Sequence, residues 1–197
     1  MLFRSLVQAP ASHRNLELDE ARELAEAAPD ALERVLVTPT DEVDAIDGIL
    51  DEVPADVVQA TGAIEPEDLV TLADEHGVDA WKGLGLSDKV ADTVEAIDRC
   101  ADAGADAVVL DALQEGYGGH GEQIDWGHAG QARRSIAIDL VLAGGLTPDN
   151  VAEAVREVDP WGVDVSSGIE TDEANDEAKM RAFVTAARDH EEEEEGS

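Results

Sequence analysis

Seven short apolar segments alternate along this chain with seven amphipathic segments. The apolar segments have strand length and fall at residues 2–8, 34–38, 56–60, 80–84, 106–111, 136–143 and 161–166. The amphipathic segments have a helical period and fall at 17–28, 41–52, 66–76, 87–103, 126–134, 148–157 and 176–189. Strands that alternate with helices at about 25–30 residues per unit are parallel and joined by right-handed crossovers. The pattern therefore predicts seven βα units in an α/β fold.

Two architectures accept seven βα units. One is an open doubly wound sheet, and the other is a (β/α)8 TIM barrel that lacks one unit. The runs "DAVVLD" and "IDLVLAGG" are almost wholly apolar, as strands buried on both faces are. A complete barrel has about 250 residues, so this length suits seven units. Periodicity alone does not choose between the two. In either case we expect one domain over 1–189 and a disordered acidic tail at 190–197.

Acidic residues outnumber basic ones by 47 to 13, which gives a formal net charge of -34. Such a surface repels nucleic-acid phosphates and anionic lipids, so we expect neither nucleic acid nor membrane as a partner. The acid could form a solvating coat over every helix, as in proteins of very salty cytoplasm, or one patch for a basic partner. Asp and Glu recur throughout, as in "LELDEARELAEAAPD" and "DEVDAIDGILDEV". This spread favours the coat, because a dedicated patch would be local.

The single cysteine, Cys100, excludes an internal disulfide and indicates a reducing compartment. No apolar run approaches the roughly 18 residues of a membrane helix. The start "MLFRSLVQ" is too short and wrongly flanked for a secretory signal. The sequence thus predicts a cytoplasmic protein. The histidines show no metal-ligand spacing, so no metal is expected. The sequence does not decide whether the chain forms a homo-oligomer.

Two glycine-containing segments follow the last two predicted strands. Gly144 and Gly145 end one strand shortly before a helix, for which Thr147 is the expected N-cap and Pro148 a first-turn residue. Ser166, Ser167 and Gly168 end the next strand. Each segment alone is equally a tight turn. Together they predict a phosphate site, because the loops after the last two strands of a barrel frequently form one.

Asp111 closes the apolar strand "AVVLD", where its carboxylate would point into the mouth of the barrel. A partly desolvated carboxylate has a raised pKa and can act as a general acid, although a loop-capping role is commoner for a lone Asp. The following "GYGGHG" matches a dinucleotide motif by letter. No helix opens on it, so Gly118 and Gly119 are instead expected in a loop over the ligand.

Arg14 follows the first predicted strand in "APASHRNL". Its guanidinium could bind a substrate carboxylate through two parallel hydrogen bonds. A role as an ordinary surface arginine is equally consistent with the sequence.

The chain resembles the phosphoribosylanthranilate isomerase family of tryptophan biosynthesis, which has a (β/α)8 barrel. The resemblance is strongest in "VLDALQEGYGGHGEQIDW", "LAGGLTPDNVAEAVREVDPWGVDVSSGIE" and "KMRAFVTAAR". The segment "VVQATG" is similar to the family's V-Q-L-H-G strand end, with Thr61 in place of the histidine. The segment "SLVQAPASHRNLELDEARELAEAAP" is similar to the family's second unit.

The resemblance implies an Amadori rearrangement of N-(5-phosphoribosyl)anthranilate to 1-(2-carboxyphenylamino)-1-deoxyribulose 5-phosphate, without a cofactor. It implies Asp111 as the general acid and Arg14 as the residue that meets the anthranilate end. It implies that Gly144, Gly145, Ser166, Ser167 and Gly168 bind the phosphate. Asp164 matches a family aspartate, although its place in a buried strand is equally consistent with a structural role.

The chain also departs from the family. The family's general base is a cysteine in a first strand reading K-I-C-G-I-T, and neither that strand nor its helix occurs here. Cys100 lies in the wrong unit to replace it. We therefore expect a barrel without its first βα unit, carrying an acid and a phosphate site but no base. The alternatives are a phosphosugar-binding relative without activity, and another phosphosugar isomerase or epimerase of the same barrel type.

Overall fold

The structure is a computed structural model that describes residues 2–112 and 123–194. Its strands are β1 (Phe3–Val7), β2 (Glu33–Thr38), β3 (Val57–Ala60), β4 (Asp79–Gly85), β5 (Ala107–Asp111), β6 (Asp139–Leu142), β7 (Gly162–Val163), β8 (Glu170–Thr171) and β9 (Ala174–Asn175). Its helices are α1 (Leu18–Ala27), α2 (Val43–Glu52), α3 (Pro66–His76), α4 (Val90–Ala103), α5 (Trp126–Arg133), α6 (Val151–Val158) and α7 (Glu177–Glu194), with a 3₁₀ turn η1 (Ser167–Ile169).

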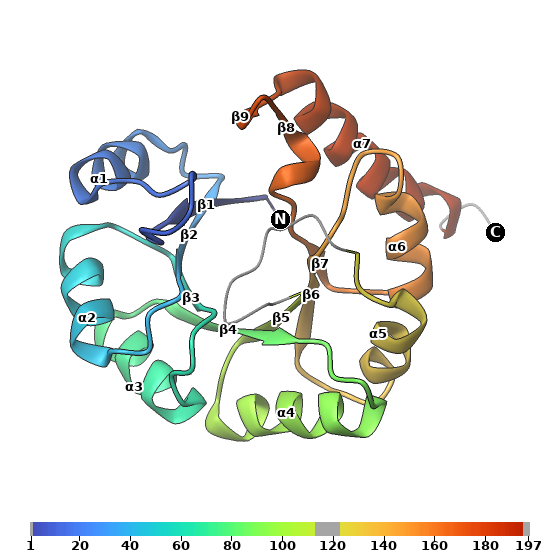
Figure 1. Cartoon of the computed structure of the whole chain (residues 1–197), viewed down its shortest axis with the longest axis horizontal. Helices are drawn as coiled ribbons and strands as arrows, with labels where there is room; N and C mark the ends of the chain where they lie inside the picture. Colours follow the sequence, from blue (N-terminus) through green and yellow to red (C-terminus); the bar gives the residue numbers. More distant parts are fainter. Residues whose placement is uncertain (1, 113–122, 195–197) are drawn as a thin grey trace. The chain divides into compact units, whose positions relative to one another are not determined.

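The strand order decides between the two predicted architectures. The main sheet runs β1-β2-β3-β4-β5-β6-β7, so each strand lies beside its neighbours in sequence. The pairs β1–β2, β2–β3, β3–β4 and β6–β7 are parallel. A doubly wound sheet reverses its order at a switch point, whereas a barrel does not. The seven βα units expected from the sequence are confirmed, and they follow the barrel order (Figure 1).

Several predicted boundaries were wrong. The strands expected at 136–143 and 161–166 are shorter in the structure, as β6 and β7; β7 ends before the chain turns into η1. Helix α6 begins at Val151 with Asn150 as its N-cap, so Thr147 is not the cap and Pro148 lies in the preceding turn. The short β8–β9 hairpin was not predicted. The helix expected at 176–189 is α7, which begins at Glu177 and ends at Glu194.

The residues group into two compact units. The first unit comprises 1–83 and 99–108, and the second comprises 84–98 and 109–197. In the first unit, Leu36 and Val58 on the strands pack with Ile46 of α2 and Leu69 of α3. Leu6 of β1 packs in a smaller cluster with helix α1. These contacts cover the outer face of β1–β4 with helices α1–α3.

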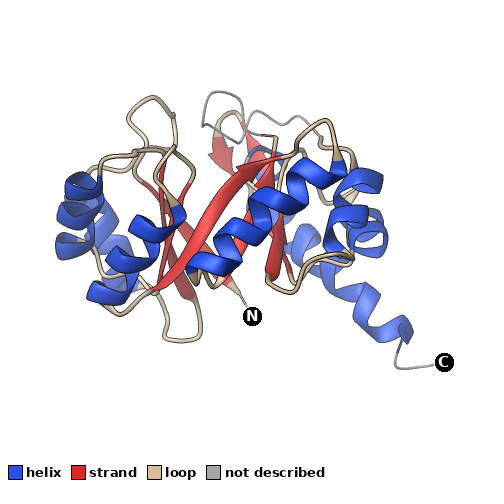
Figure 2. Ribbon diagram, turned by 90° about the horizontal axis from the view of Figure 1, so that it is seen from below, coloured by secondary structure: helices blue, strands red, loops and turns tan. Residues whose placement is uncertain are grey.

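The second unit contains the later βα elements. The Ala143 N–H donates to the Leu110 carbonyl at 2.9 Å, which joins the ends of β5 and β6. Helix α6 contacts both α5 and α7, and it buries Val151, Ala154 and Val158. Figure 2 shows helices flanking the strands and loops at the strand ends. The carboxyl ends of β5, β6 and β7 thus share one group of loops.

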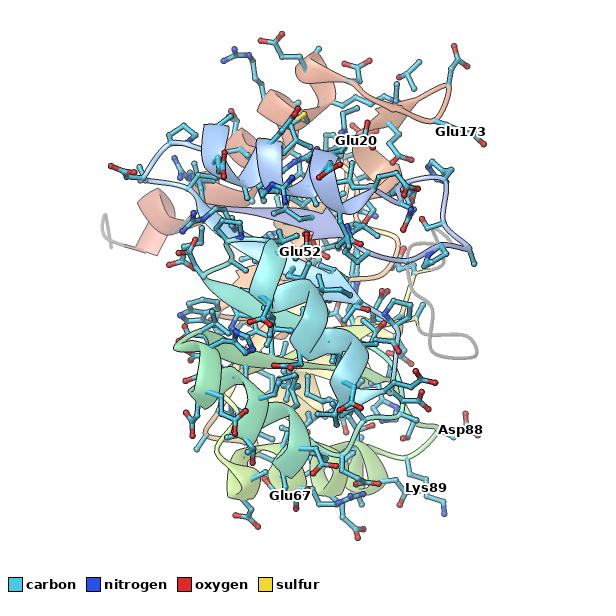
Figure 3. The ribbon with its side chains drawn as sticks, turned by 90° about the vertical axis from the view of Figure 1, so that its left-hand side faces the viewer. Glu20, Glu52, Glu67, Asp88, Lys89 and Glu173 are labelled. Atoms are coloured by element: carbon cyan, nitrogen blue, oxygen red, sulfur yellow. The ribbon has the colours of Figure 1, made fainter. Side chains whose placement is uncertain are left out.

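Acidic side chains project from many elements of the surface. Figure 3 labels Glu20 on α1, Glu52 on α2, Glu67 on α3, Asp88 before α4 and Glu173 between β8 and β9. All five side chains belong to exposed residues. This distribution agrees with the solvating coat expected from the sequence. No helix among the described residues is long and apolar enough to cross a membrane.

Carboxylates gather at the amino ends of the strands in the first unit. Arg34 donates to both oxygens of Asp56, from Nε at 2.8 Å and from Nη2 at 2.6 Å. That pairing lowers the pKa of Asp56. The pKa of Asp79 shifts in the opposite direction. Desolvation raises it most, and the negative charges of Asp106 and Asp56 raise it further. At neutral pH the ionised Asp79 therefore destabilises the fold.

Asp79→Asn should accordingly stabilise the chain at pH 7, by less than about 1 kcal/mol because the residue is exposed and screened. Because the pKa of Asp79 is raised in the folded state, ionisation of Asp79 destabilises the fold only as pH rises from the unfolded-state pKa through the folded-state pKa. The stability gained by Asp79→Asn should therefore vanish below the unfolded-state pKa of about 4. It should also shrink in molar salt. Urea unfolding across pH and salt measures it. Asp74→Asn on α3 is the charge-matched control, and an equal gain there would assign the effect to net charge alone.

Candidate active site

Asp111 ends β5, after four buried residues that fix the strand in the core. Its carboxylate is part-buried, and Oδ1 accepts a hydrogen bond from the Ala112 N–H at 2.7 Å. The following residues 113–122 lie outside the described part of the chain, and with them Gly118 and Gly119. The backbone contact holds the Asp111 carboxyl group at the carboxyl end of β5. A barrel binds its ligands at this end of the strands.

The loop after β6 lies directly against this carboxylate. Gly144 and Gly145 have φ of 86° and 66°, which an L side chain rarely adopts. A Cβ on Gly144 would lie 3.0 Å from Asp111 Oδ1 and 3.1 Å from the Ala112 nitrogen. Glycine is therefore required here for two reasons, its dihedral angles and its close approach to Asp111. The two predicted features, the acid and the paired glycines, lie in contact.

Asn150 holds the same loop from its far side. Its Nδ2 donates to the Gly145 carbonyl at 3.0 Å, and its Oδ1 accepts from the Thr147 N–H at 2.7 Å. Asn150 is also the N-cap of α6. The loop therefore joins the amino end of a helix, where the helix dipole favours an anion. Sequence reasoning missed this residue, although an Asn three positions after a Thr, before a helix, is a signal for such a turn.

The loop after β7 completes the site. The Asp164 N–H donates to the Leu142 carbonyl at 2.9 Å, which aligns β7 with β6. The chain then enters η1 at Ser167. A Cβ on Gly168 would lie only 1.9 Å from the Leu146 carbonyl oxygen. The two predicted phosphate loops are thus packed backbone to backbone, and Gly168 is the contact between them.

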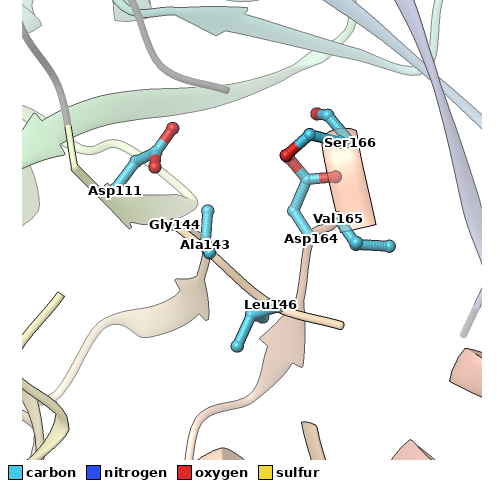
Figure 4. A pocket seen from close by; sticks show the side chains of 9 residues that line it. Asp111, Ala143, Gly144, Leu146, Asp164, Val165 and Ser166 are labelled. Carbon is cyan, nitrogen blue, oxygen red and sulfur yellow. The ribbon is translucent and has the colours of Figure 1, made fainter. Parts of the chain in front are cut away.

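These residues line one pocket of the second unit. Its lining residues are Asp111, Ala143, Gly144, Gly145, Leu146, Asp164, Val165, Ser166 and Ser167. Figure 4 shows the Asp111 carboxylate on one side, Asp164 and Ser166 on the other, and Gly144 between them. The pocket therefore gathers six residues expected from the sequence. Gly168 supports it from the contact with Leu146.

Other predicted residues lie elsewhere. Arg14 belongs to the loop after β1 in the first unit. Its backbone N–H donates to Ser12 Oγ at 3.1 Å. Cys100 is 1% exposed in α4, and desolvation raises the pKa of its thiol. A buried thiol of raised pKa is a packing group rather than a reactive thiolate. Within the described residues, no group of three or more His, Cys, Asp or Glu side chains is placed to hold a metal ion.

The chain is similar over most of its length to one known family. Residues 2–186 match the family described as N-(5'phosphoribosyl)anthranilate (PRA) isomerase. The N-(5'-phosphoribosyl)anthranilate isomerase of Haloferax volcanii is 39% identical over 188 residues, covering 91% of this chain and 82% of the relative.

Solved structures agree with the sequence match. The phosphoribosyl anthranilate isomerase from Thermotoga maritima is 28% identical with a TM-score of 0.81, covering 95% of this chain and 88% of that one. A phosphoribosyl anthranilate isomerase in complex with reduced 1-(o-carboxyphenylamino)-1-deoxyribulose 5-phosphate has a TM-score of 0.79 at 26% identity. That match covers 95% of this chain and 87% of the other. With its seven sequential βα units and a carboxylate beside two packed loops, this chain belongs to the N-(5'-phosphoribosyl)anthranilate isomerase family.

Proposed function

We propose that this chain forms the acid and phosphate-binding part of an N-(5'-phosphoribosyl)anthranilate isomerase of tryptophan biosynthesis. The observation that carries the proposal is the contact between Gly144 and the Asp111 carboxylate, which brings a candidate acid and a candidate phosphate loop into one pocket. A substrate whose sugar ring carries a phosphate needs both within a single site. Family membership supplies the identity of that substrate.

The phosphate would bind to backbone amides of the two packed loops. Gly144 and Gly145 let the first loop approach an anion closely, and the Ser166 and Ser167 hydroxyls border the same pocket. The amino end of α6 adds its dipole. Backbone N–H groups suit this chain, because they bind an anion in a protein of net charge -34 without an added cation.

Asp111 would act as the general acid of the rearrangement. It would protonate the ring oxygen as the C1–O bond breaks, which opens the sugar to an iminium. A base would then remove the C2 proton, and the resulting enolamine would tautomerise to the ketone. The reaction moves hydrogen within the substrate, so it consumes no oxidant or reductant. Arg14 would bind the anthranilate carboxylate.

The resemblance leaves the general base unassigned among these residues. The family's cysteine has no counterpart in the 197 residues, and Cys100 is buried with a thiol pKa raised by desolvation. We propose that the base is a group other than Cys100. The site of action would be the cytoplasm. A Thermotoga maritima relative is described as dimeric, so the oligomeric state of this chain is worth measuring.

Binding and turnover test this function separately. Calorimetry with reduced 1-(o-carboxyphenylamino)-1-deoxyribulose 5-phosphate should show binding to the 197-residue chain without turnover of N-(5'-phosphoribosyl)anthranilate. A chimera that adds the first βα unit of the Haloferax volcanii relative should complement a tryptophan auxotroph that lacks this isomerase. Growth with the 197-residue chain alone would disprove the hypothesis that these residues lack a general base. A chimera that binds the analogue but never turns over would favour a phosphosugar-binding relative without activity.

A further inference from the structure

Lys82 of β4 is a charged side chain in an unusual place. It is 6% exposed, whereas lysine is almost never buried unless it is paired. Its ammonium donates to three backbone carbonyls, those of Gly62 at 2.8 Å, Gly83 at 3.1 Å and Ala60 at 3.4 Å. An ammonium has three N–H donors, so these contacts satisfy it. Desolvation by burial lowers the pKa of Lys82, because it disfavours the charged ammonium.

The ammonium reaches the end of β3 from the helix side of the sheet. Ala80, two residues earlier on β4, packs in the core cluster with α2 and α3. Alternate residues of a strand share a face, so Lys82 points the same way. Trp81 points to the opposite face, where its ring meets Phe3 edge-to-face at 5.5 Å. Lys82 therefore supports the turn 60–62 from behind.

The turn that Lys82 holds is packed against both neighbouring strand ends. The Thr61 N–H donates to the carbonyl of Thr38, the last residue of β2, at 2.9 Å. A Cβ on Gly62 would lie 2.1 Å from the Pro39 carbonyl oxygen. A Cβ on Gly83 would lie 2.8 Å from the Thr61 methyl group, on the face opposite to Lys82. The carboxyl ends of β2, β3 and β4 thus form one interlocked group.

We propose that Lys82 is a positioning residue for substrate binding, which acts by fixing the backbone of Ala60, Thr61 and Gly62 at the ligand-binding end of the first unit. The proposal rests on the proposed function, since the carboxyl strand ends of a barrel are its ligand-binding face. Without the ammonium, the Gly62 and Ala60 carbonyls would lose the hydrogen bonds that Lys82 donates to them. The turn would then move, and it would carry Thr61 away from its place on the inner face.

Lys82→Met tests this with two measurements on the 197-residue chain. Hydrogen exchange of the Thr61 amide, measured by NMR, should accelerate at least about tenfold. The hydrogen bond of that amide to Thr38 opens more often when the turn is less firmly held. Affinity for the reduced product analogue should fall by about ten- to hundredfold, the size of a lost charge-assisted contact. Binding of inorganic phosphate, followed at the Ser167 and Gly168 amides of the second unit, should be unchanged.

Two further variants separate positioning from general destabilisation. Thr93→Val removes another buried polar group, which accepts from the Ser87 N–H and donates to the Lys89 carbonyl away from the turn. It should leave Thr61 exchange and analogue affinity unchanged. Lys82→Gln keeps an N–H donor and should give intermediate values, and it serves if the Met variant does not fold.

The outcomes distinguish the two proposals. Unchanged Thr61 exchange in both Lys82 variants would overturn the inference, as would analogue affinity equal to wild type. If wild type itself does not bind the analogue, the proposed function fails and the substrate-binding part of this inference fails with it. Thr61 exchange would still show whether Lys82 fixes the turn.

Discussion

Asp111→Asn should lower kcat of the chimera completed with a first βα unit by about 10²–10⁴-fold, the range for losing one well-placed general acid. Asparagine keeps the shape of the carboxyl group and can still accept from the Ala112 N–H. It cannot deliver a proton to the sugar ring oxygen at neutral pH. The reduced product analogue needs no protonation, so its affinity should change by only a few-fold. Steady-state turnover and calorimetry on the same sample measure the two effects.

Asp164→Asn is the matched control, since Asp164 is the second carboxylate lining the same pocket. A fall in kcat confined to Asp111→Asn would identify the Asp111 carboxyl group as the donor of the proton to the ring oxygen. Equal losses in both variants would mean that the pocket responds to charge rather than to a specific acid. A near-normal rate in Asp111→Asn would refute the assignment of the acid.

Local patterns in the sequence predicted the fold well, for an identifiable reason. Strands such as β5 are buried over their whole length up to Asp111, so their apolar runs stand out from the acidic helices between them. An apolar run predicts a strand buried on both faces whichever neighbouring elements cover it. The errors at β6 and β7 have other causes. The apolar residues 136–138 precede β6 without belonging to it, and residues 164–166 after β7 line the pocket instead of extending the strand.

The site was predictable as a set of residues but not as an arrangement. Two glycine-containing strand ends indicate a phosphate site, but no sequence pattern shows that Gly168 would lie against the Leu146 carbonyl. The N-cap of α6 was misplaced because Thr147 and Asn150 are both good caps, and the choice depends on the Asn150 contact with Gly145. The buried Lys82 gave no signal either, since two of its three carbonyl partners, Ala60 and Gly62, belong to the end of β3 and the turn after it.

Gly168→Ala should disrupt the phosphate site more than any other single methyl group added to these loops. The new Cβ would lie 1.9 Å from the Leu146 carbonyl oxygen, 2.9 Å from its carbon and 3.1 Å from Thr147 Cα. All three atoms are backbone, so no side-chain rotation relieves the clash. One loop must move away from the other, which destabilises the fold by about 1–3 kcal/mol. Phosphate binding should become undetectable in an NMR titration, because the proposed hydrogen-bond donors come from both loops.

Gly48→Ala is the control that separates this clash from the mere addition of a methyl group. A Cβ on Gly48 meets no atom within 4 Å, and the residue lies inside α2. Alanine there should raise stability by about 0.5–1 kcal/mol, since glycine is the poorer helix former. It should leave phosphate affinity unchanged. If Gly168→Ala binds phosphate as wild type does, the anion does not bridge the two loops, and the pocket beside Asp111 must bind its ligand through the Gly144 loop alone.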